Sequence, residues 1–177
     1  MEDHIETERL LLRPTNTEDV EFIYRLMNTP KWIQNIGDRK ITSTQKAAEY
    51  IDQKMTPQLE SLGFSNYTVI RKTDQEKLGT CGLYDREGLD SVDIGFAFLP
   101  EYERKGYALE AASKLMQVGM DKFGLTIIDA ITTKENSASQ KLLEKLGLSI
   151  IGDITLPNVD ETLLHYRIEK EHIQTKD

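Results

Sequence analysis

Hydrophobic and polar positions follow two different spacings between residues 93 and 123. Asp93 to Leu99 is mostly apolar, which predicts a half-buried strand, and Pro100 ends it because proline has no N–H to donate to a sheet. After a polar turn at 103–106 the apolar residues recur at helical spacing. The apolar face of this predicted helix consists of Ala108, Ala111, Ala112, Leu115, Gly119 and Phe123. The segment is therefore predicted to be a strand, a turn and a long amphipathic helix.

The rest of the chain supplies further strands and helices. Apolar patterns predict strands at 7–13, 66–71, 78–84, 125–133, 149–152 and 162–168. Predicted helices begin at Asn16 or Thr17, at Ser43 or Thr44 with a kink or break near Pro57, and at Asn136. Short turns between the strands at 66–71, 78–84 and 93–99 indicate an antiparallel meander. The strand, helix and strand that follow indicate a parallel crossover, and hence a mixed α/β chain.

Composition describes an ordinary globular protein. The 177 residues fit a single domain spanning 1–177, and 38% are hydrophobic and 29% charged. A single cysteine, Cys81, excludes an internal disulfide framework, fits a cytoplasmic location and is expected to be a small core residue of a strand. No apolar run approaches ~20 residues, and the acidic N-terminus lacks the regions of a signal peptide, so no membrane partner is expected.

The net charge of −8 bears on the kind of partner. It argues against a nucleic acid, whose phosphates would be repelled. It is compatible with steering a cationic amine toward the protein, and equally with simple solubility. A homodimer is left open.

The turn before the long helix has the chemistry of a phosphate site. The first turn of a helix presents unpaired N–H groups and a partial positive charge. Arg104 and Lys105 add full charges, and Gly106 lets a ligand approach the backbone closely. The alternative is a basic surface turn between a strand and a helix.

Residues Pro100 to Ala111 resemble the acetyl-CoA loop of the GNAT acetyltransferase superfamily, and in particular the branch of the ribosomal-protein N-terminal acetyltransferases. The superfamily pattern is Gln or Arg, two residues, Gly, one residue, and Gly or Ala. Gly106 and Ala108 match it. Glu103 replaces the usual Gln or Arg, and Arg104 stands where glycine is frequent, so we expect Glu103 to turn away from the ligand.

Two further stretches resemble the same family. Residues 136–148 match its Asn-x-x-Ser and Leu-Glu-Lys-x-Gly signature, and residues 7–14 match an opening common in this branch. The resemblance extends over residues 7–168. It implies the GNAT fold: a largely antiparallel sheet of six to seven strands with a parallel splayed pair, flanked by about four helices.

The resemblance also implies a reaction and its site. An enzyme of this family transfers the acetyl group of acetyl-CoA to a primary amine, by direct attack in a ternary complex, without a metal. Backbone N–H groups at a bulge of the central strand, here Phe98 and Leu99, would stabilise the thioester carbonyl. The remaining residues assigned to cofactor binding are Arg104, Lys105, Gly106, Tyr107, Ala108, Asn136 and Ser139.

Candidate catalytic residues follow from the steps of this reaction. Asp93, or a water that it holds, is the preferred base, and Glu110 more plausibly complements the helix dipole. Ser139 is the candidate acid for the leaving thiolate, because the tyrosine used by many relatives is replaced by Leu143. His165 could still reach the acceptor site.

The acceptor is expected to contact Trp32, Tyr84 and Asp93, although a lone Trp is equally well a core residue. The motifs do not choose between a protein N-terminal amine and a small-molecule amine. A catalytically silent CoA-binding or regulatory domain is the alternative, which Glu103 and Leu143 favour slightly. A dinucleotide-binding module is less well supported, because its Gly-x-Gly-x-x-Gly signature is missing after an early strand.

Overall fold

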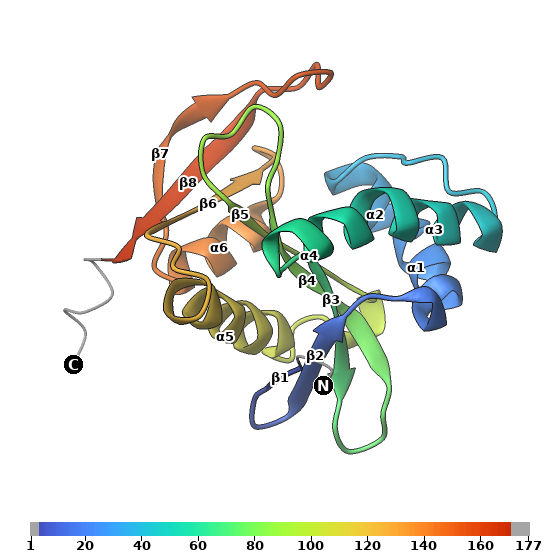
Figure 1. Ribbon diagram of the computed structural model, residues 1–177. Coiled ribbons are helices and arrows are strands. Elements are labelled where there is room, and N and C mark those ends of the chain that lie inside the picture. Colours follow the sequence, from blue (N-terminus) through green and yellow to red (C-terminus); the bar gives the residue numbers. More distant parts are fainter. Residues whose placement is uncertain (1–3, 171–177) are drawn as a thin grey trace.

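The computed structural model describes residues 4–170, which form one mixed sheet with helices on both faces (Figure 1). The eight strands within this range are β1 (Ile5–Glu6), β2 (Leu10–Pro14), β3 (Asn66–Arg71), β4 (Lys77–Tyr84), β5 (Asp93–Phe98), β6 (Ile127–Thr132), β7 (Ser149–Ile154) and β8 (Leu163–Glu169). Their order in the sheet is β1-β2-β3-β4-β5-β6-β8-β7. Neighbours are antiparallel except β5 and β6, which are parallel. The predicted meander and crossover are therefore confirmed.

Helical segments account for most of the remaining chain. They are η1 (Thr17–Asp19), α1 (Val20–Met27), α2 (Pro30–Asn35), α3 (Thr44–Tyr50), η2 (Ile51–Met55), α4 (Thr56–Leu62), η3 (Pro100–Tyr102), α5 (Tyr107–Asp121) and α6 (Ser137–Lys145). Asn16, Ser43 and Asn136 cap η1, α3 and α6, as their positions in the sequence predict. The helix expected from Ser43 is interrupted by η2, a π-helical turn directly before α4, of which Pro57 is the second residue.

The start of the chain differs from the prediction. Residues 7–9 form a turn instead of the beginning of a strand, and the Thr7 hydroxyl accepts a hydrogen bond from the Leu10 N–H at 3.0 Å. The strand begins at Leu10, and the short β1 pairs with it. This hairpin raises the strand count to eight, from the six to seven expected.

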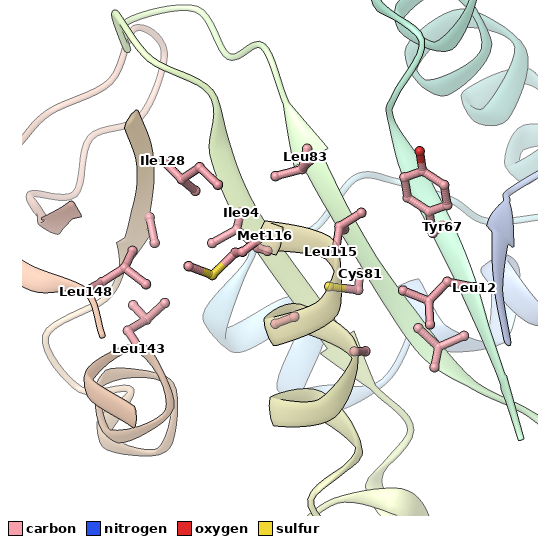
Figure 2. Packing of buried hydrophobic residues seen from close by; sticks show 14 of the residues in the cluster. Leu12, Tyr67, Cys81, Leu83, Ile94, Leu115, Met116, Ile128, Leu143 and Leu148 are labelled. Carbon is pink, nitrogen blue, oxygen red and sulfur yellow. The ribbon is translucent and has the colours of Figure 1, made fainter. Parts of the chain in front are cut away.

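The main core lies between the sheet and α5 (Figure 2). The inward face of α5 consists of Tyr107, Ala111, Ala112, Leu115, Met116, Gly119 and Met120, whereas Ala108 and Phe123 are only partly buried. Leu83, Ile94 and Ile128 meet this helix from three strands. Cys81 belongs to the same core, as predicted, and burial raises the pKa of its thiol to about 12.

The opposite face of the sheet carries the group of helices α1 to α4 (Figure 1). Their own apolar cluster is centred on Ile23, Met27 and Ile51. Polar contacts tie this group to the sheet, because the Thr68 hydroxyl of β3 donates to the buried carboxylate of Asp19 in η1 at 2.9 Å. The two faces of the sheet therefore differ: one is apolar under α5, and the other is largely polar.

Candidate functional site

The parallel strands β5 and β6 separate soon after they meet. Asp93 and Asp129 are their single pair of register partners, and the Asp129 N–H donates to the Val92 carbonyl at 2.9 Å. Beyond this pair the described chain has no ladder between the two strands, so they diverge toward Phe98 and Thr132. The splayed pair that the family resemblance implies is therefore present, and the two strands are closest at the two aspartates, the closed end of the splay.

The open end of this splay leads to the N-terminus of α5. Gly106 occupies the N-cap position with φ +81°, and no side chain caps the helix. The N–H groups at 107–109 consequently lack helical partners, whereas Asn136 caps the first turn of α6. A 15-residue helix with an open first turn presents its amides and dipole to an anion.

The charges around this turn are arranged to suit an anion. Arg104 and Lys105 are exposed, and Arg104 adopts a left-handed conformation with φ +59°. Glu103 forms an ion pair with Lys31 of α2, so its negative charge is compensated and directed to that helix. The side chain that departs from the family pattern therefore leaves no unpaired carboxylate beside the amides.

Arg9, which follows the N-terminal strand β1, forms hydrogen bonds to the same turn and to the helix after it. Its Nε donates to Glu110 Oε2 at 2.7 Å and its Nη1 donates to the Lys105 carbonyl at 3.1 Å. Glu110 also accepts from the Thr7 hydroxyl at 2.6 Å. Burial raises the pKa of Glu110, but the hydrogen bonds from Thr7 and Arg9 outweigh it and hold the pKa below its usual value. Glu110 is thus part of a structural ion pair at the helix N-terminus.

A row of polar residues crosses the sheet at the closed end of the splay. Tyr84, Asp93, Asp129 and Arg167 are successive register partners on β4, β5, β6 and β8. Partners in register point to the same face, and their sequence neighbours Leu83, Ile94 and Ile128 pack under α5. The polar row therefore lies on the face opposite α5.

Both aspartates of this row are buried and paired. Asp93 is 1% exposed and accepts from Arg86 Nε at 3.0 Å and Nη2 at 3.2 Å. Burial raises the pKa of Asp93, and the Arg86 guanidinium opposes this only in part. Asp129 is 0% exposed and accepts from Arg167 Nε at 2.7 Å and from Arg167 Nη2 at 3.0 Å.

Asp129 has a third partner in His165, whose Nε2 lies 2.8 Å from Asp129 Oδ2. Burial raises the pKa of Asp129, but the hydrogen bonds from Arg167 and His165 outweigh it and lower the pKa below its usual value. The closed end of the splay thus combines two carboxylates, two guanidinium groups and one imidazole.

The backbone of β5 corrects one expectation. The register between β4 and β5 is continuous from Gly79–Phe98 to Tyr84–Asp93, so β5 has no bulge there. The Leu99 N–H already donates to the Leu78 carbonyl at 2.9 Å and is not available to a ligand, contrary to the prediction. Amides alternate along a strand, so the Phe98 N–H points away from β4 and toward the splay.

Glycines in β4 and β5 make room for Tyr84. A Cβ on Gly82 would lie 2.4 Å from the Tyr84 ring, and one on Gly95 would lie 2.9 Å from it. The ring therefore lies across both strands, and its hydroxyl donates to Asn66 Oδ1 at 2.5 Å. The lack of a Cβ at Gly82 and Gly95 therefore gives the Tyr84 ring its space.

The other predicted residues lie on neighbouring elements. Asn136 Oδ1 accepts from the Ser139 N–H at 3.2 Å, which leaves the Asn136 Nδ2 group for another partner. Tyr107 is buried, with its ring 4.4 Å from the Arg9 guanidinium, so its side chain supports the turn and its N–H belongs to the open first turn. Trp32 packs among the helices α1 to α3, and its buried Nε1 has no partner.

Sequence reasoning missed Arg9, Arg86 and Asp129. Arg9 falls within the family-like opening at 7–14, and that resemblance was the available signal. Arg86 lies in a polar loop and Asp129 in an apolar strand, so no local pattern marks either as part of a site. An aspartate inside a predicted buried strand is the one indication that a partner must exist.

Other features of residues 4–170 bear on the chemistry. They contain no group of three or more His, Cys, Asp or Glu side chains placed to hold a metal ion. None of their helices is both long and apolar enough to cross a membrane.

A cavity of about 550 Å³ lies between the N-terminal hairpin, α4 and α5, and none of the predicted site residues lines it.

Comparison with known proteins agrees with this architecture. Residues 9–149 match the family described as Acetyltransferase (GNAT) domain. The uncharacterized N-acetyltransferase YoaA of Bacillus subtilis is 29% identical over 149 residues, 84% of each chain. The spermidine N(1)-acetyltransferase of Escherichia coli is 24% identical over 81% of this chain and 74% of its own.

Solved structures give the same result for the fold. An acetyltransferase (GNAT family) from Bacillus anthracis superposes with a TM-score of 0.78 at 26% identity, covering 95% of this chain and 99% of that one. RimL, a ribosomal L7/L12 alpha-N-protein acetyltransferase in complex with coenzyme A, gives 0.79 at 16% identity over 94% and 98% of the two chains.

Proposed function

This chain belongs to the acetyltransferase (GNAT) domain family and is an acetyl-CoA-dependent N-acetyltransferase, and from that premise we propose that it acetylates a primary amine by direct attack in a ternary complex. One observation supports the proposal above the others. The β5–β6 splay, closed at Asp93 and Asp129, opens toward the uncapped N-terminus of α5. A long donor molecule with a diphosphate at one end and a thioester at the other fits that arrangement.

The cofactor end of the site is proposed as follows. The diphosphate of acetyl-CoA binds the amides of Tyr107 and Ala108, with Arg104 and Lys105 closing over it. The pantetheine arm enters the splay, where Asn136 Nδ2 donates to one of its amide carbonyls. The Phe98 N–H donates to the thioester carbonyl, and a donor fixed before the reaction costs no reorganisation as charge develops.

The acceptor is proposed to bind on the face opposite α5. Tyr84 and Asp93, the latter held by Arg86, form its floor. Trp32 of α2 is proposed to line the acceptor site with the part of its side chain that is not packed among the helices. Ser139, in the first turn of α6, returns a proton to the departing thiolate.

A silent CoA-binding domain is the competing function. Leu143 has no acidic proton and is buried in the core, so it cannot protonate the departing thiolate. In an active enzyme, Ser139 is proposed to protonate it instead. Glu103 does not favour the catalytically silent domain, because its ion pair with Lys31 compensates the negative charge beside the proposed diphosphate site.

Calorimetry with CoA, followed by a thiol-release assay, tests the proposal. The amine panel contains spermidine, a peptide with the N-terminus of ribosomal protein L7/L12, and an amino sugar. CoA binding together with turnover of at least one amine is expected. Binding without turnover on any amine would favour the silent domain, and no binding of CoA would remove the proposal altogether.

A further inference from the structure

The imidazole of His165 lies at the closed end of the β5–β6 splay, bound to a fully buried carboxylate. We propose that His165 is the general base that deprotonates the acceptor amine, and that Asp129 holds it in the reactive tautomer. The proposal rests on the acetyl transfer described above and adds the residue that removes the proton.

The geometry sets the protonation pattern of the ring. Asp129 Oδ2 lies 2.8 Å from His165 Nε2, and Arg167 fixes the same carboxylate through two hydrogen bonds. An ionised carboxylate accepts, so Nε2 carries the proton and donates, which leaves a lone pair on Nδ1. An acid that orients an imidazole in this way is the arrangement of hydrolytic triads.

The second ring nitrogen is accessible. Among residues 4–170, Trp32 Nε1 is the one buried side-chain N or O atom without a hydrogen-bond partner. His165 Nδ1 has no hydrogen-bond partner within this range and is not among its fully buried atoms, and the His165 side chain is 14% exposed. The imidazole thus has one nitrogen anchored and one free to take a proton.

The ring is also on the correct side of the sheet. His165 of β8 is the register partner of Ile131, two residues beyond Asp129 toward the open end of the splay. Residues 129 and 131 share a face, so His165 lies with Asp93 and Tyr84 on the face opposite α5. The thioester enters from the α5 end and the amine approaches from this face, so the ring lies on the side of the sheet from which the amine is proposed to approach.

The competing carboxylates are already engaged. Asp93 is 1% exposed and doubly bound to Arg86. Glu110 is held by Thr7 and Arg9 at the far end of the splay. His165 therefore replaces Asp93, the base preferred from the sequence.

The proton balance of the step is complete with these residues. The ammonium gives one proton to His165 Nδ1, which passes it to solvent. The neutral nitrogen attacks the thioester carbonyl carbon, and the C–N bond forms. Collapse of the tetrahedral intermediate breaks the C–S bond, and the thiolate takes the Ser139 hydroxyl proton, which Ser139 regains from the former amine nitrogen.

A base is needed because a Lys-like amine is neutral in only about one molecule in 2,500 at pH 7. The charged groups around the His165 cluster are Asp129 on β6, Arg167 and Glu169 on β8, the Asp93–Arg86 pair and Asp90 near Arg167. Without a base only the small neutral fraction of the amine can attack, so the pH dependence of kcat/KM then follows the amine itself.

The test compares His165→Gln with His4→Gln, an exposed histidine remote from the splay. With the best amine of the panel at pH 7, His165→Gln should lower kcat/KM about 100-fold and move the acid limb of the pH profile to higher pH, toward the pKa of the amine itself. With 2,2,2-trifluoroethylamine, which is already neutral at this pH, the loss should be only a few-fold. CoA affinity should be unchanged, and His4→Gln should behave as the wild type.

A second measurement does not depend on the variant folding. Nitrogen-15 NMR of the wild type should show His165 protonated at Nε2 and bare at Nδ1. The opposite tautomer would overturn the proposal, as would equal losses on both amines or an unchanged acid limb in His165→Gln. A wild type that binds CoA but acetylates no amine would overturn the proposed function as well, so the two failures are distinguishable.

Discussion

The guanidinium of Arg9 binds the carboxylate of Glu110 across the junction between the N-terminal hairpin and α5, with 2.7 Å between Nε and Oε2. The Arg9 backbone N–H reaches the same carboxylate at 2.9 Å. Through its bond to the Lys105 carbonyl, the same side chain fixes the turn at which the diphosphate is proposed to bind. The opening of the chain thus supports a turn about one hundred residues later.

Replacing Arg9 with alanine should weaken CoA binding more than it weakens the fold. Arg9 is partly exposed, so its loss should cost about 1 kcal/mol of unfolding free energy. The freed turn should raise the Kd for CoA about tenfold, measured by calorimetry. Arg25→Ala is the matched control, because Arg25 binds Glu101 of the same connection at the surface, and its Kd should stay within about twofold. Equal effects of the two variants would contradict the role of Arg9.

Gly106→Ala should impair cofactor binding specifically. Alanine at φ +81° costs about 1–2 kcal/mol, and its Cβ would lie 3.3 Å from Arg9 Nη2. Gly124→Ala carries a comparable cost at φ +69° with no atom within 4 Å of the Cβ. Both variants should lose similar stability in urea, whereas only Gly106→Ala should raise the Kd for CoA, by at least about tenfold. A normal Kd in Gly106→Ala would argue against binding at this turn.

Gly95→Ala should displace the Tyr84 ring. A Cβ only 2.9 Å from the ring overpacks the contact and should cost about 1–3 kcal/mol. The acceptor KM should rise severalfold, with CoA affinity unchanged. In a Tyr84→Ala background the same substitution should cost less than about 0.5 kcal/mol, because the clashing group is absent. If the stability losses of Gly95→Ala and Tyr84→Ala simply add in the double variant, a clash with the Tyr84 ring is not what destabilises Gly95→Ala.

Asp19 should dominate the loss of stability in acid. It is fully buried, binds Arg13 and Lys77, and has a pKa lowered from 3.8 to about 2, because these hydrogen bonds outweigh the effect of burial. A folded-state pKa below the unfolded value stabilises the fold above pH 4, and this stabilisation disappears as the pH falls through about 2. The shift corresponds to about 2 kcal/mol at neutral pH.

Urea denaturation of Asp19→Asn at several pH values measures this contribution. The variant should be less stable than the wild type by at least about 2 kcal/mol at pH 7, and the gap should narrow between pH 4 and pH 2. Asp38→Asn, an exposed carboxylate paired with Lys40, should show almost no gap at any pH. If the difference in unfolding free energy between the wild type and Asp19→Asn stays constant from pH 7 to pH 2, titration of Asp19 is not its cause.

The sequence by itself determined the elements and the turn. Strand 66–71 was predicted to the residue, and the caps Asn16, Ser43 and Asn136 marked three helix starts correctly. Gly106 and the helix after it were also predicted. These features depend on the spacing of hydrophobic residues, on proline's lack of an N–H group and on helix capping. Each involves residues only a few positions apart, so each can be read from the sequence.

Only the tertiary structure decided which side chains meet at the closed end of the splay. Tyr84, Asp93, Asp129 and Arg167 form one row because four strands align in a particular register, and a shift of one residue would send a member to the other face. The approach of His165 to Asp129, 36 residues away, depends on the same alignment. Register is set by the packing of the whole sheet, so no local pattern records it.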